Sequence, residues 1–190
     1  MSKILIIGLL ALICANILIA QDYKSEVKEQ VPLILKALNH NNSLKDKIRD
    51  KCVIAVLYNA QNSVSDNERK VISNELNDHK NIKVHGKKIN VVEIPLTMDL
   101  NLEKQVIIKK INAFWLTSGT LPYMNNIRES AKYNQVMTIT ANQDLVTGSL
   151  AVLGTQKTDS GYKLLLNLSE ANNINANLNK NLLSEAIVIQ

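Results

Sequence analysis

The fold is decided by the stretch "CVIAVLY" at residues 52–58 and the stretch "VSDNERKVISNELND" at residues 64–78. The first is a continuous apolar run, as expected of a strand that is buried on both faces of a sheet. The second has apolar residues at helical spacing, and Ser65 and Glu68 have the spacing of a capping box. A buried strand followed by an amphipathic helix predicts an α/β domain.

The same alternation continues in both directions along the chain. Toward the N-terminus, "DYKSEVKEQVPLILKALNH" has helical periodicity, and Pro32 predicts either a kink or a helix that begins near this proline. Toward the C-terminus, further strands are predicted at 88–95, 111–119 and 135–142, and helices at 103–110 and 121–134.

The last strands form a predicted hairpin. "GSLAVLGT" and "GYKLLLNL" flank the polar segment "QKTDS", which indicates two strands joined by a longer loop. We therefore expect one α/β domain over residues 21–190. Its mainly parallel sheet has helices on both faces, an antiparallel hairpin at the C-terminal edge, and terminal helices.

The C-terminal segment combines many amides with a regular apolar pattern. Ser169 is the predicted N-cap of a helix, the asparagines near 172–177 predict a turn, and a last helix is expected to start near Asn179. The amides are most simply interpreted as solvated surface and turn residues. The alternative is a polar recognition face.

The N-terminus has the pattern of a secretory signal. In "MSKILIIGLLALICANILIA", a lysine precedes an apolar run that ends at Ala20, where we expect cleavage. The mature protein would then be periplasmic and would keep Cys52 as its one cysteine, which we expect to be buried. The alternative is a retained membrane anchor, because the apolar run is close to the length of a bilayer span.

Composition and spacing argue against several classes of function. The formal charge of +5 is spread thinly and aromatic residues make up only 4%, which argues against a nucleic-acid partner. The histidines, His40, His79 and His85, match no strong zinc signature, and the turn after residue 58 has no glycine for a phosphate-binding loop. We expect no catalytic set, no metal and no cofactor.

One crevice is predicted at the ends of the strands. Ser118 follows the strand at 111–119, and α/β sheets bind ligands beyond the carboxyl ends of their strands. Thr117, Ser118 and Asn142 are the candidate lining residues, and a structural turn is the competing interpretation. Trp115 is expected in the core.

From about Cys52 onward the sequence resembles the periplasmic YfiR-like proteins. The resemblance rests on "VMTITANQDLVTGSLAVL" and "GYKLLLNLSEANNINANLNKNLLSEA". The residues that match the family's structural pattern are Gly148, Asn167, Leu168, Leu182 and Leu183. The disulfide cysteines of the best-known member have no counterpart here.

The resemblance implies a non-enzymatic regulator in cyclic-di-GMP signalling. Such a protein would bind and repress the periplasmic domain of a membrane sensor, a diguanylate cyclase or a kinase, and could form a homodimer. The alternative from the residues alone is a periplasmic small-solute-binding protein that works with a transport or sensor system. An enzyme ranks third among these interpretations, because the sequence shows no acid–base or nucleophile–base pair.

Overall fold

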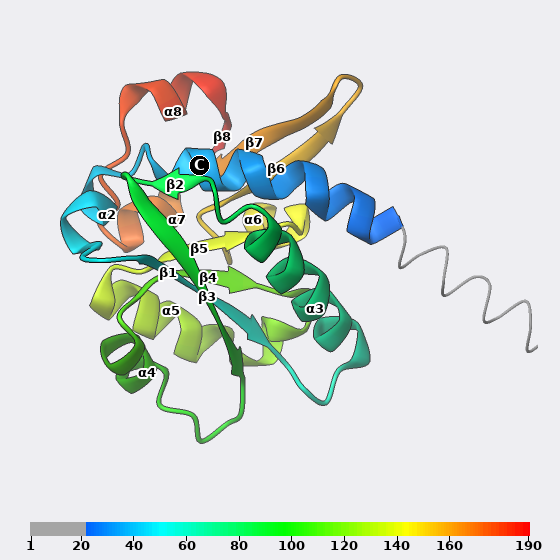
Figure 1. The fold of residues 1–190 in the computed structure, drawn as a ribbon, viewed down its shortest axis with the longest axis vertical. Coiled ribbons are helices and arrows are strands. Elements are labelled where there is room, and N and C mark those ends of the chain that lie inside the picture. Colours follow the sequence, from blue (N-terminus) through cyan, green and yellow to red (C-terminus); the bar gives the residue numbers. More distant parts are fainter. Residues whose placement is uncertain (1–21) are drawn as a thin grey trace, which may run out of the picture.

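The computed structural model describes residues 22–190 as an eight-stranded sheet with helices on both sides (Figure 1). The strand order is β2-β3-β1-β4-β5-β6-β7-β8. The strands are β1 (Cys52–Tyr58), β2 (Lys83–Val84), β3 (Lys87–Pro95), β4 (Ile111–Leu116), β5 (Met137–Thr140), β6 (Leu153–Thr158), β7 (Gly161–Asn167) and β8 (Ile187–Ile189). Five adjacent strands, from β3 to β6, run parallel. The predicted α/β class is confirmed.

The helices cover both faces of this sheet. The N-terminal helix (residues 22–38) and α3 lie on one side, and α4 and α5 lie on the other (Figure 1). The labelled helices are α2 (Asn42–Lys47), α3 (Ser63–Asp78), α4 (Leu102–Lys109), η1 (Ser118–Tyr123), α5 (Met124–Asn134), α6 (Gln143–Thr147), α7 (Leu168–Asn173) and α8 (Lys180–Glu185). The predicted signal segment, residues 1–20, lies outside the described residues.

The N-terminal helix runs through Pro32, so a helix that begins near this proline is not what forms. Proline removes one backbone hydrogen bond and crowds the preceding turn. The apolar face offsets this loss, because Val27, Val31, Ile34 and Leu38 are fully buried against the sheet. Tertiary packing therefore keeps the helix continuous through Pro32.

The hairpin differs from the prediction in three ways. Its loop is tighter, because Thr158 already pairs with Gly161, which has a φ of +112°. Its first strand starts only at Leu153, because the first residues of the predicted strand form the connection from helix α6 to β6. The sequence pattern did not reveal α6. The hairpin is also not the sheet edge, because β8 pairs parallel to β7 beyond it.

Helix starts were also partly mispredicted. The helix expected at 121–134 is split into the 3-10 helix η1 and α5, which begins at Met124. Ser65 is not a cap: Asn62 caps α3 by accepting a hydrogen bond from the Ser65 backbone. Likewise Asn167, and not Ser169, caps α7. The expected last helix does begin after Asn179.

Many asparagines are helix caps and not merely solvated amides. In α2, α3, α4, α6, α7 and α8 the N-cap is an asparagine whose side chain accepts a backbone N–H of the first turn. Asparagine suits this position because its short side chain reaches the unpaired N–H groups of the first turn. The Asn-rich composition is therefore in part a consequence of many short helices.

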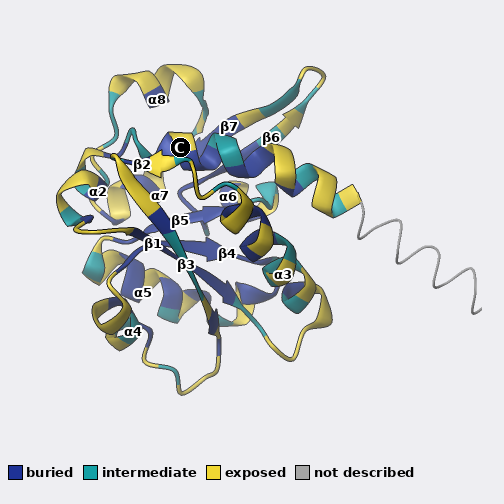
Figure 2. Cartoon of the chain, in the orientation of Figure 1, coloured by how far each residue is buried: buried dark blue, intermediate teal, exposed yellow. Residues whose placement is uncertain are grey.

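The parallel strands form the buried centre (Figure 2). β4 is buried along its whole length, and Phe114 and Trp115 are among the largest fully buried side chains. Cys52 is also fully buried, and burial raises the pKa of its thiol to about 12. The predictions for Trp115 and Cys52 as core residues are confirmed.

Candidate functional site

The strand order creates a switch point, where successive connections lead to opposite sides of β1. From β1 the chain crosses to β3 on one side, and β4 then lies on the other side of β1. In open α/β sheets, ligands bind outside the carboxyl ends of the strands at such a switch point. Here that point lies between the ends of β1 and β4, next to the N-terminus of α3.

Direct packing closes this switch point. Gly119 lies so close to α3 that a Cβ atom added to it would be 2.5 Å from the Cβ of Ser65. The Oγ of Ser65 and the Oγ1 of Thr117 are 2.7 Å apart. The Glu68 carboxylate accepts the Ser118 N–H at 2.6 Å and the Ser118 hydroxyl at 2.8 Å. No room for a ligand remains between these residues.

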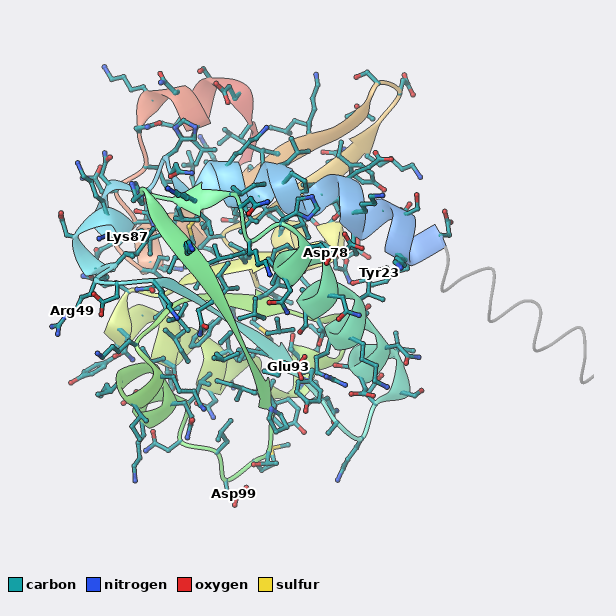
Figure 3. All side chains as sticks on the ribbon, viewed as in Figure 1. Tyr23, Arg49, Asp78, Lys87, Glu93 and Asp99 are labelled. Atoms are coloured by element: carbon teal, nitrogen blue, oxygen red, sulfur yellow. The ribbon has the colours of Figure 1, made fainter. Side chains whose placement is uncertain are left out.

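A pocket of about 350 Å³ opens beside the closed point, toward β5 and β6. It lies between the N-terminal helix, α3, the end of β5 and the hairpin. In Figure 3, Tyr23 lies in the first described turn of the N-terminal helix, near α3. The lining residues are Tyr23, Glu26, Gln30, Glu68, Ala141, Asn142, Gln143, Thr155, Lys157 and Tyr162. We call this the carboxyl-edge pocket.

The pocket wall is held by contacts between the N-terminal helix and β6. At the buried end, the Thr155 hydroxyl donates to Oε1 of Gln30 at 2.9 Å. Near the surface, Nζ of Lys157 donates to Oε1 of Glu26 at 2.9 Å. This ion pair is exposed to solvent and adds little stability. Its value here is to hold the Glu26 carboxylate at the pocket mouth.

The environment of the pocket shifts several pKa values. Burial, with Glu68 and Glu26 nearby, raises the pKa of Tyr23 far above its ordinary value, so its phenol stays protonated. Burial also raises the pKa of Glu68, although the two hydrogen bonds from Ser118 partly oppose this rise. Burial and the Glu26 carboxylate raise the pKa of Tyr162. The pocket thus presents two neutral phenols beside two carboxyl groups.

The balance of charge favours one kind of ligand. The charged groups that line the pocket are Glu26, Glu68 and Lys157, and Lys157 pairs with Glu26, so the pocket with all three ionised has one net negative charge. Asn142 adds a donor, because its Oδ1 caps α6 and its Nδ2 bonds to no other described residue. A small solute with a positive group and several hydrogen-bonding groups matches this lining.

The structure separates the three residues that the sequence placed in a crevice. Asn142 lines the carboxyl-edge pocket, whereas Thr117 and Ser118 do not. Thr117 is buried and donates to the Leu57 carbonyl at 3.0 Å, so its role is structural. Ser118 contributes indirectly, because it holds the Glu68 carboxylate.

Sequence reasoning missed the side chains of the N-terminal helix. Tyr23, Glu26 and Gln30 recur at intervals of three and four residues, which places them on one helix face. This polar face lies beside the apolar stripe of the same helix, and its spacing could have predicted a set of polar side chains at the site. Tyr162 and Lys157 carried no comparable signal, because they meet the helix only through the tertiary fold.

The residues that match the YfiR-like pattern have structural positions. Asn167 is buried, caps α7 and donates to the Val146 carbonyl. Gly148 ends α6, where a Cβ would lie 2.9 Å from the Asp144 carbonyl oxygen. Leu182 is fully buried, Leu168 is half-buried and Leu183 is 38% exposed.

Two further findings concern residues 22–190. In this range no group of three or more His, Cys, Asp or Glu side chains is arranged to hold a metal ion. Each histidine contacts another residue instead; His85, for example, lies 2.9 Å from the Asn41 carbonyl oxygen. No helix in the described part is long and apolar enough to cross a membrane.

Comparison with known proteins gives matches only at the level of structure. No protein-family model matches the chain, and no curated protein matches its sequence. One similar structure is an ABC domain in complex with L-Trp from Streptococcus pneumoniae, with a TM-score of 0.58 and 12% identity. The match covers 86% of this chain and 60% of that one.

Two other solved structures are similar. One is a ligand-free, open substrate binding protein with adhesive properties from Clostridium difficile (TM-score 0.54, 15% identity, 77% of this chain and 57% of that one). The other is a conserved domain protein from Vibrio cholerae (TM-score 0.53, 12% identity, 78% and 58%). The chain thus spans less than two thirds of the length of these structures, and the likeness is one of fold.

Proposed function

We propose that this protein is a small-solute-binding protein whose ligand carries a protonated amine. The observation that carries the proposal is the carboxyl-edge pocket, where Glu26, Glu68, Tyr23 and Tyr162 converge. Carboxylates pair with an ammonium group through charge-assisted hydrogen bonds, and tyrosine rings attract cations. The position at the carboxyl side of a parallel sheet supports a ligand site.

The structural neighbours support the same class of function. One of them is a substrate binding protein, and another was solved with L-Trp, an amino acid that carries a protonated amine. We infer from them that the bound solute is an amino acid or a related amine. The N-terminal apolar segment supports a periplasmic location for the mature protein. On this proposal the protein binds its ligand and does not transform it.

A thermal-unfolding screen tests the proposal. The panel contains free L-amino acids, short aliphatic diamines, and the N-acetyl forms of the same amino acids. A ligand at 100 times its Kd stabilises the folded state by about 2.7 kcal/mol. For a domain of this size that corresponds to a rise in Tm of roughly 5–10 °C.

The expected result is a rise in Tm with at least one free amine and none with its N-acetyl form. The proposal fails if no amine in the panel raises the Tm. It also fails if the acetylated forms stabilise the protein equally, because the carboxylates would then not bind the protonated amine. A neutral sugar that alone stabilises the protein would contradict the assigned ligand class.

The regulatory reading from the YfiR-like resemblance stays a prediction. What favours a protein contact is a group of exposed large apolar side chains on η1, α4, α5 and the loop before α4: Met98, Ile107, Ile108, Leu121 and Tyr133. Crosslinking in intact cells, followed by mass spectrometry, tests this reading. Attachment to a membrane protein with a cyclase or kinase domain would support it, and attachment only to transporter components would support solute binding.

A further inference from the structure

A second pocket lies at the opposite edge of the sheet and has the opposite charge. Its volume is about 490 Å³, and it opens where β1 and β4 begin. Figure 3 shows Arg49 at this edge and Tyr23 on the far side of the molecule. The charged lining residues are Lys47, Arg49, Asp50, Lys51, Lys109 and Lys110. We call this the amino-edge pocket.

The topology explains why these charges gather. Lys47, Arg49 and Lys51 lie at the end of α2 and in the connection to β1, and Lys109 and Lys110 join α4 to β4. Because β1 and β4 are adjacent and parallel, both connections meet at the same edge. Five cations against one carboxylate leave an excess of four positive charges, compared with +5 for the whole chain.

The cations are not neutralised within residues 22–190. None of the five forms an ion pair with a carboxylate in this range; the ion pairs found there involve Arg69, Lys70, Arg128 and Lys157. Lys47 donates instead to the carbonyl oxygens of Asn134 and Gln135, at 2.9 and 3.1 Å. Lysines that follow α4 can complement its dipole, but this does not account for Arg49 and Lys51.

The lining of the pocket includes the amide of Asn112, whose oxygen is hydrogen-bonded within the protein. Asn112 is 7% exposed and lies at a shift in register between β1 and β4. Its Oδ1 accepts the Val53 N–H at 2.8 Å, which fixes the orientation of the amide. Its Nδ2 bonds to no other described residue, and Asn112 lines the pocket. A neutral donor in the lining of a cationic pocket suits an anion.

We propose that the amino-edge pocket binds an anionic phosphate group. Such a group offers several acceptor oxygens to Arg49, the lysines and the Nδ2 of Asn112. It would also relieve the repulsion among five cations that share one pocket. A site at this edge is separate from the carboxyl-edge pocket, so the protein would carry two ligands of opposite charge.

The phosphate can come from a soluble compound or from an anionic phospholipid headgroup. Ile107 lines the pocket and is 66% exposed, and its neighbour Ile108 is 62% exposed. Apolar side chains at the rim of a cationic pocket are suited to the boundary between lipid headgroups and acyl chains. The two sources share the same charge chemistry and differ in whether Ile107 contributes.

Isothermal titration of the mature protein with sodium pyrophosphate tests the first source. Vesicle flotation with phosphatidylglycerol in phosphatidylcholine, against phosphatidylcholine alone, tests the second. The Lys51→Gln/Lys109→Gln variant is expected to weaken binding by about tenfold or more, which corresponds to the loss of one or two charge-assisted hydrogen bonds. The matched control is Lys24→Gln/Lys28→Gln, which removes the same charge from exposed positions on the N-terminal helix.

Binding of pyrophosphate alone would assign a soluble ligand, and flotation that is lost in Ile107→Ser would assign a headgroup. The proposal is overturned if neither probe binds at about 0.15 M salt, or if both lysine pairs weaken binding equally. Glu26→Gln should leave pyrophosphate affinity unchanged, so the outcome is independent of the amine site.

Discussion

The close contact between η1 and α3 makes Gly119→Ala a sharp test of the packing that positions the site. In wild type the Gly119 position has no room for a methyl group, since an added Cβ would lie 2.5 Å from the Ser65 Cβ and 2.8 Å from its Oγ. Carbon atoms in contact normally lie about 3.5–4.0 Å apart. Ser65 cannot rotate freely, because its Oγ accepts the Asn59 N–H at 2.9 Å and lies 2.7 Å from the Thr117 Oγ1.

The size of the effect follows from these contacts. Relieving the overlap requires α3 and η1 to separate by about 1 Å, and overpacking of this kind costs about 1–3 kcal/mol. Weakening one of the Ser65 hydrogen bonds adds about 0.5–1.5 kcal/mol. The lower entropy of an unfolded chain with alanine offsets about 0.4–1 kcal/mol. We expect Gly119→Ala to lower the free energy of unfolding by about 2–3 kcal/mol.

Urea unfolding followed by circular dichroism measures this loss, provided that the slope with urea is unchanged. The matched variant is Ser65→Gly, which removes the side chain that the new methyl group would meet. In the Ser65→Gly background the same Gly119→Ala change should be close to neutral, giving a coupling energy of about 2 kcal/mol. A penalty below about 0.5 kcal/mol in wild type, or an equal penalty in both backgrounds, would refute the reasoning.

Two further predictions concern the caps and the buried carboxyl group. Asn101→Ala, at the exposed cap of α4, should cost about 0.5–1 kcal/mol. Asn167→Ala should cost about 2–4 kcal/mol, because it also removes the hydrogen bonds from Nδ2 of Asn167 to the Val146 carbonyl and the Ser149 hydroxyl. Equal losses in urea unfolding would contradict this. Burial raises the pKa of Glu68 above its ordinary 4.5, so its contribution to stability is fully present below that pH and is lost as the pH rises through the folded-state value. The unfolding free energy of wild type relative to Glu68→Gln should therefore fall as the pH rises above 4.5, and a flat difference would show that the pKa of Glu68 is not raised.

The sequence predicts the central strands and most of the helices around them because their burial pattern is local. "CVIAVLY" is apolar throughout and "INAFWL" is apolar except for Asn112, as a parallel strand that is buried on both faces requires. Helix ends are set by single residues that compete for the same role. Asn62 and Ser65 could each cap α3, and the choice depends on the contact of Ser65 with Thr117, far away in the sequence.

The candidate site is less predictable because it is assembled by tertiary contacts. Asn142 is found by position, since it follows a strand at the carboxyl edge. Glu68 has the spacing of a capping residue, yet it reaches across to Ser118 and lines the pocket. The short strand β8 is also missed, because three apolar residues at a chain end have no periodicity to separate strand from helix.

The central claim is that carboxylates in the carboxyl-edge pocket bind a protonated amine. The most direct measurement is isothermal titration of the best amine from the thermal screen into wild type, Glu26→Gln and Glu29→Gln. Glu26 lines the pocket, whereas Glu29 lies on the same helix, exposed and outside it. The account predicts that Glu26→Gln weakens binding by about tenfold, the loss of one charge-assisted hydrogen bond, while Glu29→Gln binds as wild type does. Equal affinity for all three proteins would contradict it.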